Sequence, residues 1–317
     1  MKRKLIALTV LISGLCVITF GQVTEGEKNL RTQSADTTQG WKNGGVFAVN
    51  LAQTSLKNWA AGGQNSVAVN GMFSVFANLI NGKSRWDNVL DMGYGLLKQG
   101  KEDFRKTDDK IDLLSKYGRQ AFSNFYYAAL LNFKTQMTPG YNYPDVTKKI
   151  SDLFAPAYLL VALGMDYKPN ANFTAFIAPL TAKFTFVTND SLSAAGAFGV
   201  EPGEKSKSEM GGYIRAAYTK NDFKGEFMKN IAFTTKIDLF SNYAENPQNI
   251  DVSWENLIAM KVNKYISVNL NTHLMYDDNI LIKIDRNNDG DVADIEDVPG
   301  KRIQFKEIFG VGFSYKF

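Results

Sequence analysis

The chain has 317 residues, a formal net charge of +4, 22 Phe, 14 Tyr and a single cysteine. Three basic residues at positions 2–4 precede an apolar run over residues 5–20, which predicts a cleaved secretory signal over residues 1–21. Removing this segment lowers the formal charge from +4 to +1, so charge gives little support for nucleic-acid binding. It also removes Cys16, which excludes disulfides and cysteine-based sites from the remaining chain.

A lipoprotein signal cleaved before Cys16 is the alternative interpretation of this terminus. Residues 22–44 are polar and show no periodicity, which predicts a flexible periplasmic segment. No later apolar run reaches the roughly 18 residues that a membrane helix requires. An exported, aromatic-rich chain without helical spans is typical of an outer-membrane β-barrel, which we expect over residues 45–317.

Apolar and polar residues alternate with period two along most of this region, as in strands with one lipid face and one polar lumen face. In residues 231–239, for example, Lys236 and Asp238 share one face while Ile237 and Leu239 share the other. Pro179 within one strand predicts a bulge. The fold class is therefore all-β: an antiparallel, up-and-down transmembrane barrel of about twelve strands. We expect strands at 45–55, 66–80, 84–98, 110–118, 122–137, 156–168, 172–188, 211–220, 226–242, 251–262, 265–277 and 303–317.

The connections after even-numbered strands are short, and most of those after odd-numbered strands are long and polar. Outer-membrane barrels keep short turns in the periplasm and long loops outside the cell. A soluble β-sandwich also alternates, but it does not require this rhythm and its strands are typically shorter. The pattern favours a barrel in the outer membrane of a Gram-negative cell.

The last long loop contains the sequence DRNNDGDVADIE at residues 285–296. Its spacing matches the calcium-binding loop of an EF-hand, although strands rather than helices flank it. Extracellular calcium can fill a weak site, so we expect a structural calcium ion that orders this loop. The alternative is a solvated acidic loop that matches by chance. The candidate ligands are Asp285, Asn287, Asp289, Asp291 through its carbonyl, and Glu296.

The chain ends in alternating aromatic residues, with Phe313 and Tyr315 before Phe317. This ending resembles the C-terminal signal by which barrel-insertion machinery recognises outer-membrane barrels. Segments 50–66, 143–170 and 302–317 together resemble an outer-membrane family catalogued as domain of unknown function 3078. The resemblance covers about residues 41–317, and it implies a barrel with no established activity and no site residues to transfer.

His273 is the only histidine, and alternation places it on the lumen face with Asn269 and Asn271. Some calcium-dependent phospholipase barrels carry a serine and a histidine on the lipid-facing wall, so His273 lies on the wrong side for that chemistry. We therefore expect a protein without enzymatic activity and keep a membrane-embedded hydrolase as the alternative. A nucleophile and a base placed together on one wall would favour the hydrolase.

The lumen face carries charges of both signs, which fit either a salt-bridged plug or a selective polar passage. The expected function is a narrow channel for small polar solutes, or a scaffold whose loops bind partners. The expected partners are outer-membrane lipid and the insertion machinery, but no nucleic acid; the solute is not identified. The charges at lumen positions are Asp87, Asp91, Lys134, Asp166, Lys183, Lys236, Asp238, Glu255, Lys261 and Lys306.

Overall fold

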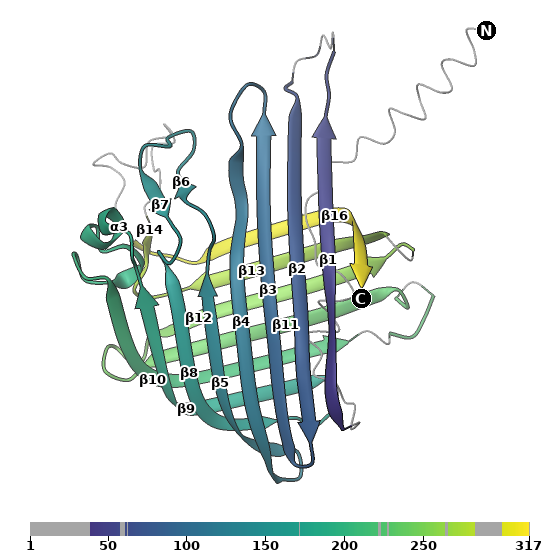
Figure 1. Cartoon of the computed structure of the whole chain (residues 1–317), viewed down its shortest axis with the longest axis vertical. Coiled ribbons are helices and arrows are strands. Elements are labelled where there is room, and N and C mark those ends of the chain that lie inside the picture. The colour runs from purple at the N-terminus through teal and green to yellow at the C-terminus, as the bar shows by residue number, and fades with distance from the viewer. Residues whose placement is uncertain are drawn as a thin grey trace.

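Twelve strands form one closed barrel in which every neighbouring pair is antiparallel (Figure 1). The computed structural model describes residues 39–57, 61, 63–170, 172–220, 223–226, 228–263, 266–282 and 300–316. The strands follow one another around the barrel in chain order, so the predicted up-and-down topology is confirmed. No helix in these described ranges has the length and apolar character of a membrane span.

The barrel strands agree closely with the predicted segments. Their bounds are β1 (Gly40–Thr54), β2 (Ser66–Asn81), β3 (Ser84–Gln99), β4 (Arg105–Phe122), β5 (Phe125–Thr135), β8 (Ala157–Tyr167), β9 (Phe173–Phe186), β10 (Ser206–Lys220), β11 (Ile231–Asn242), β12 (Ile250–Lys261), β13 (Ile266–Tyr276) and β16 (Gln304–Lys316).

Some strand ends differ from the prediction. β1 begins at Gly40 rather than residue 45, and β4 covers Arg105–Phe122 rather than 110–118. Alternation in β4 is weak because Leu114, between Asp112 and Lys116 on the inward face, packs against a buried apolar cluster. An apolar residue on the polar face hides the period of two.

The two ends of the barrel differ in their connections. Residues 82–83, 123–124, 168–172, 221–230 and 262–265 connect strands at one end, which we call the short-turn end. The opposite, long-loop end carries residues 55–65, 100–104, 136–156, 187–205, 243–249 and 277–303. Four short strands pair there: β6 (Gly140–Tyr141) with β7 (Lys149–Ser151), and β14 (Leu281–Ile282) with β15 (Gly300–Lys301). None of these four strands was predicted, because strands this short show no periodicity.

The loop over residues 187–205 has its own small core at the long-loop end (Figure 1). It contains helix α3 (Asp190–Ala194) and the 3-10 turn η1 (Ala197–Gly199). Asn189 caps α3 by accepting hydrogen bonds from the backbone N–H groups of Ser191 and Leu192, which satisfies two free donors at the helix start. The buried side chains of this core are Ala155, Val187, Leu192 and Val200.

The bulge predicted at Pro179 is present. Leu163 pairs with Leu180, but Met165 pairs with Ile177, so β9 carries one extra residue here. The side-chain hydroxyl of Tyr243 donates a hydrogen bond of 3.0 Å to the carbonyl of Pro179. A Cβ atom on Gly164 would overlap the Ile177 carbonyl, so the bulge requires glycine on the facing strand.

The barrel closes where β16 turns along β1 at its C-terminal end (Figure 1). The register there pairs Val46–Val49 with Phe313–Lys316. By contrast, β1 pairs with β2 along its whole length, from Gly40 to Thr54. The closing pair is therefore shorter than the other pairs of the wall.

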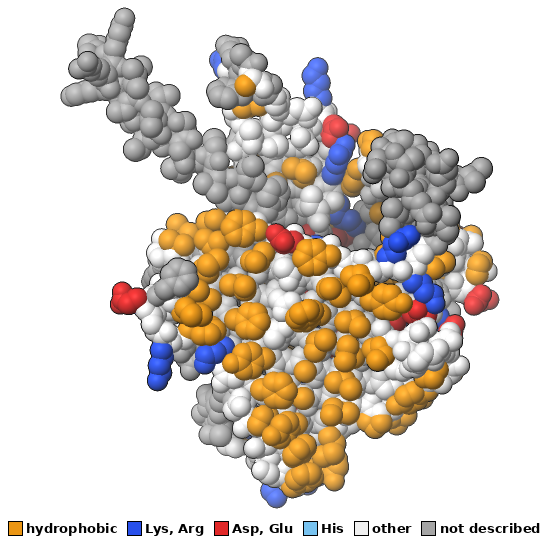
Figure 2. Space-filling model, turned by 180° about the vertical axis from the view of Figure 1, so that it is seen from behind, with side chains coloured by type: hydrophobic (Ala, Val, Ile, Leu, Met, Phe, Trp, Pro, Cys, Tyr) orange, Lys and Arg blue, Asp and Glu red, His pale blue; other side chains and the backbone are white. Residues whose placement is uncertain are grey.

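The outer wall is apolar, as Figure 2 shows for one side of the barrel. Outward positions leave large hydrophobic side chains exposed, while the residues between them are buried inside. In β11 the inward Lys236 and Asp238 are only 6% and 8% exposed. This separation is the reverse of a soluble protein's surface. The exposed apolar side chains of the middle wall include Val49, Leu51, Leu113, Leu131, Val161, Leu163, Ile177, Leu180, Met210 and Ile214.

Candidate functional site

The candidate site is the lumen, where buried charged side chains form three groups along the barrel. The first lies towards the short-turn end and joins β3, β4 and β8. The Lys116 ammonium lies 2.9 Å from the Asp166 carboxylate. The Lys168 ammonium lies 3.2 Å from Asp166 and 3.1 Å from Asp87. Because β5 separates β4 from β8, these contacts bridge two strands that are not neighbours.

The second group occupies the middle of the lumen. The Arg215 guanidinium lies 3.4 Å from the Asp238 carboxylate, which also accepts a hydrogen bond of 2.5 Å from the Tyr213 hydroxyl. On the next strand pair, Lys236 lies 2.9 Å from Glu255. Each charge therefore has an opposite charge or a hydrogen-bond donor within reach, which buried charges require.

Asp112 lies in the same middle layer on the wall formed by β4 and β5. Its carboxylate accepts a hydrogen bond of 2.7 Å from the Asn132 side chain. The ammonium groups of Lys110 and Lys134 lie 3.8 Å and 4.0 Å from it. Two lysines thus share one buried carboxylate, and this wall is positively charged.

The third group surrounds Lys183 near the long-loop end. Its ammonium lies 2.8 Å from Asp251, 3.3 Å from Glu209 and 3.5 Å from Asp277. Lys183 lies on β9 and Asp251 on β12, with β10 and β11 between them. One lysine therefore connects several elements of the long-loop end and leaves this group net negative.

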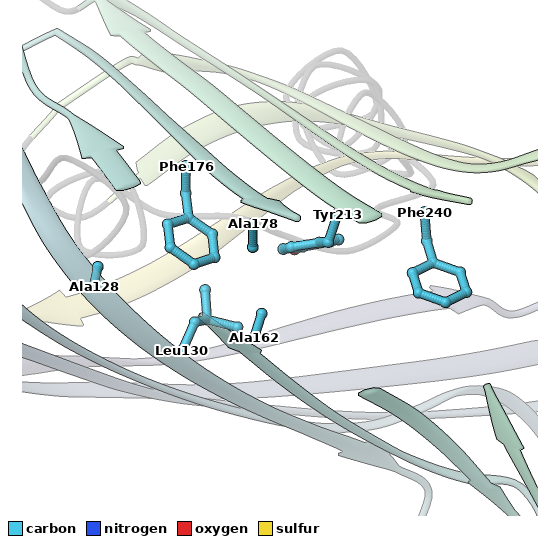
Figure 3. Close-up of a cluster of buried hydrophobic side chains, with 7 residues drawn as sticks. All are labelled: Ala128, Leu130, Ala162, Phe176, Ala178, Tyr213 and Phe240. Atoms are coloured by element: carbon cyan, nitrogen blue, oxygen red, sulfur yellow. The ribbon is translucent and has the colours of Figure 1, made fainter. Parts of the chain in front are cut away.

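An apolar cluster lines the lumen beside these charges (Figure 3). Phe176 and Tyr213 meet edge to face, with ring centroids 6.3 Å apart. The Lys183 ammonium lies 5.0 Å from the centroid of the Phe240 ring, which links the cluster to the third charged group. This packing narrows the interior between β5 and β11. The cluster consists of Ala128, Leu130, Ala162, Phe176, Ala178, Tyr213 and Phe240.

His273 faces the lumen, as predicted, and its partner there is a serine. The Nε2 atom of His273 on β13 lies 2.9 Å from the Oγ atom of Ser253 on β12. Both side chains are partly buried. Glu255 stands directly opposite His273 in the register of the two strands. A nucleophile and a base are therefore together on one wall, and this wall is the lumenal one.

The other predicted lumen charges have varied surroundings. Asp91 accepts a hydrogen bond from the Ser74 hydroxyl, and Lys306 lies 3.1 Å from Asp108 on β4. Lys261 is exposed at the end of β12. The predicted calcium ligands Asp285, Asn287, Asp289, Asp291 and Glu296 and the predicted insertion residue Phe317 lie outside the described residues. Within the described part of the chain, no three His, Cys, Asp or Glu side chains are arranged to hold a metal ion.

Several partners in these groups were not predicted from the sequence. Asp112 and Lys116 lie in the strand with weak alternation, and Lys168 lies in a turn just after β8. Ser253 is on the face opposite Trp254, so alternation could have placed it in the lumen. Its contact with His273 depends on the register between β12 and β13, which alternation does not supply.

Comparisons with known proteins agree with the resemblance found in the sequence. The family described as "Protein of unknown function (DUF3078)" matches residues 51–141. This match confirms the resemblance over those residues. The matched region runs from β1 to the loop after β5. No curated protein matches the chain.

Among solved structures, one match is the translocator domain of autotransporter NalP from Neisseria meningitidis. It has 9% sequence identity and a TM-score of 0.37, and the match covers 92% of this chain and 94% of that one. At this level of likeness it carries no argument about function. The pairing of the strands itself defines the fold.

Proposed function

We propose that this protein is an outer-membrane β-barrel that provides a narrow, charge-lined passage for small polar solutes. The main support for this proposal is the opposite chemistry of the two faces of the barrel. A wall with exposed apolar side chains encloses a lumen with buried charges. Only a hydrocarbon environment makes the first face favourable, and only a polar interior accommodates the second.

Aromatic side chains near the two ends of the wall support a membrane position. At the short-turn end, the rings of Trp41 and Trp86 lie 5.8 Å apart, and several other exposed aromatics lie at the same level. Such girdles mark the two interfaces of membrane barrels. Those at the short-turn end are Trp41, Trp86, Tyr117, Phe122 and Tyr127, and those at the long-loop end include Phe104, Tyr243 and Phe305.

Ion pairs between strands that are not neighbours support a narrow passage rather than a wide pore. Lys116 reaches Asp166 and Lys183 reaches Asp251 across intervening strands. The side chains that make these contacts are buried inside the barrel and take up part of its cross-section. The passage would run past these pairs, with charges of both signs along it.

The experiment is single-channel recording of the refolded protein in planar bilayers. We expect small, discrete conductance steps, well below those of wide porins. Lys183→Ala leaves Glu209, Asp251 and Asp277 without their shared cation, so conductance should rise and selectivity should shift towards cations. Lys205→Ala is the matched control, because Lys205 is an exposed loop lysine paired with exposed Asp190. A correctly folded barrel that stays electrically silent, in both wild type and Lys183→Ala, would contradict a passage and favour a plugged scaffold.

The long-loop end faces the cell exterior in this proposal, and calcium would act there. Pairing of Ile282 with Gly300 brings the two flanks of segment 283–299 together. Backbone pairing at its base lets oxygen ligands from one segment converge on a single ion. Calcium is proposed here as a structural ion of that loop, without a sensor role.

A further inference from the structure

Ser253 and His273 hold the geometry of a nucleophile and its general base. Their side-chain atoms, Oγ and Nε2, are 2.9 Å apart, inside the range over which a base can take a serine proton. β12 begins at Ile250 and β13 ends at Tyr276, so the pair lies close to the long-loop end. Ser253 follows Asp251 of the third charged group by two residues on the same face of β12, and His273 stands opposite Glu255 of the middle group. A small molecule that enters from the long-loop end therefore meets the third group first and then this pair.

We propose that Ser253 and His273 form an acyl-transfer site in the lumen that hydrolyses small esters with short acyl chains. This activity goes beyond the proposed passage and differs from a phospholipase site on the lipid-facing wall. The position inside the barrel excludes a membrane lipid held in the bilayer as the substrate. A soluble ester that enters the mouth of the barrel is the substrate class that fits.

The surroundings of the pair support the assignment. Met275 stands opposite Ser253 in the strand register and provides an apolar contact for a short acyl group. Lys236 is held at 2.9 Å from Glu255, the residue opposite His273. Lys236 lies on β11, the strand next to β12. Its cation favours the negative charge that develops on a carbonyl oxygen during attack.

The reaction balances without any other group. His273 Nε2 takes the proton from Ser253 Oγ as this oxygen bonds to the ester carbonyl carbon. The tetrahedral intermediate collapses, the carbon–alkoxide bond breaks, and the alcohol leaves with the proton from His273. Water then loses a proton to Nε2 and its oxygen attacks the acyl carbon. The Ser253–acyl bond breaks, a carboxylic acid is released, and Oγ regains its proton.

The first test is labelling of the refolded full-length protein with a small fluorophosphonate, which phosphonylates activated serines. We expect one label, found at Ser253 by mass spectrometry, and none in Ser253→Ala. His273→Asn should slow labelling by about 100-fold, because it removes the general base. Ser74→Ala is the matched control, since Ser74 is a buried lumen serine whose hydroxyl bonds to the Asp91 carboxylate rather than to a histidine.

The second readout is hydrolysis of p-nitrophenyl acetate by the same variants. Turnover should disappear in Ser253→Ala and remain in Ser74→Ala. Heat-modifiable migration on gels establishes that each variant is a folded barrel. The proposal is overturned if folded wild type takes no label, if the label lies elsewhere, or if His273→Asn reacts as fast as wild type. Conductance is recorded separately, so failure of the passage and failure of this site remain distinguishable.

Discussion

Asp166 is the residue on which the charged group at the short-turn end depends. Its side chain is 2% exposed and lies between the ammonium groups of Lys116 and Lys168. Lys168 also has Asp87 at 3.1 Å, whereas the carboxylate nearest to the buried Lys116 is that of Asp166. Removing this carboxylate leaves the Lys116 charge buried beside Lys168 without its close partner.

We expect Asp166→Ala to lower the free energy of unfolding by about 3–5 kcal/mol, the usual cost of a buried charge that loses its partner. Adding Lys116→Ala should recover part of this loss, because the orphaned charge is then gone. Urea unfolding in detergent, followed by tryptophan fluorescence, measures both. A single variant as stable as wild type would mean that water fills this part of the lumen and that the constriction is absent.

Glycine at position 164 is a second residue-scale requirement, set by the bulge at Pro179. A methyl group there would overlap the Ile177 carbonyl, whereas at Gly118 the nearest atom to an added Cβ is 3.5 Å away. Gly164→Ala should therefore cost about 1–3 kcal/mol through forced backbone shifts. Gly118→Ala, measured in the same unfolding assay, should change stability much less. Equal effects at both positions would contradict the close approach of β8 and β9.

Alternation predicted the inward face of Lys236, Asp238 and His273 because these residues lie in regular strands, where side chains point to opposite faces in turn. Their partners were not predictable. Lys116 and Asp166 lie on strands that are not neighbours, and their meeting depends on stagger around the barrel and on bulges. Ser253 was missed for the same reason, since its bond to His273 requires the register of two strands.

At the scale of elements, the β14–β15 pair depends on Asp278. Its carboxylate accepts a hydrogen bond of 2.6 Å from the Lys301 ammonium and one of 2.8 Å from the Asn249 side chain. The Lys301 hydrogen bond is the largest influence and holds the pKa of Asp278 below its ordinary value, against a smaller opposing effect of burial. A pKa lowered by folding stabilises the folded loop above the unfolded pKa, about 3.9, and that stability is lost as pH falls through the folded pKa.

We therefore expect amide hydrogen exchange in peptides covering 277–282 and 300–303 to quicken as pH is lowered from neutral to below 4, after correction for intrinsic exchange. Asp278→Asn should exchange faster already at pH 7 and lose this acid dependence. Asp190→Asn is the control, because the Asp190 carboxylate is exposed and pairs with Lys205 within the loop over residues 187–205, rather than with a residue of β14 or β15. Identical exchange in wild type and Asp278→Asn would exclude the role assigned to Asp278.

The calcium loop is a prediction at the same scale. Asp289→Asn combined with Glu296→Gln removes one charged ligand and the bidentate ligand of the 285–296 pattern. We expect refolded wild type to bind terbium and to release it to millimolar calcium, and the double variant to lose this signal. Asp103→Asn, in the loop over residues 100–104, should bind as wild type does. Terbium emission that is unchanged in the double variant would leave the loop as an acidic, solvated segment.

At the scale of the whole molecule, the barrel fold is predictable from the sequence because a membrane barrel requires an apolar outer face and a polar inner face on every strand. The sequence shows twelve long segments that alternate with period two, and the connections between them are short and long in turn. Together these features predicted the closed sheet. The short strands of the loops and the degree to which side chains close the lumen could not be predicted from the sequence. They depend on contacts such as Lys183–Asp251, which join strands that are not neighbours.

The central claim, a barrel that crosses a membrane with charges inside, is tested most directly along β11. Because Cys16 is the only cysteine, Cys16→Ala allows one spin label at a time at residues 233–239 of the protein in lipid bilayers. Odd positions should be accessible to oxygen dissolved in lipid. Even positions, which include Lys236 and Asp238, should be shielded from lipid. A strict period of two is the predicted result; equal access of water-soluble reagents to both faces would contradict a membrane barrel.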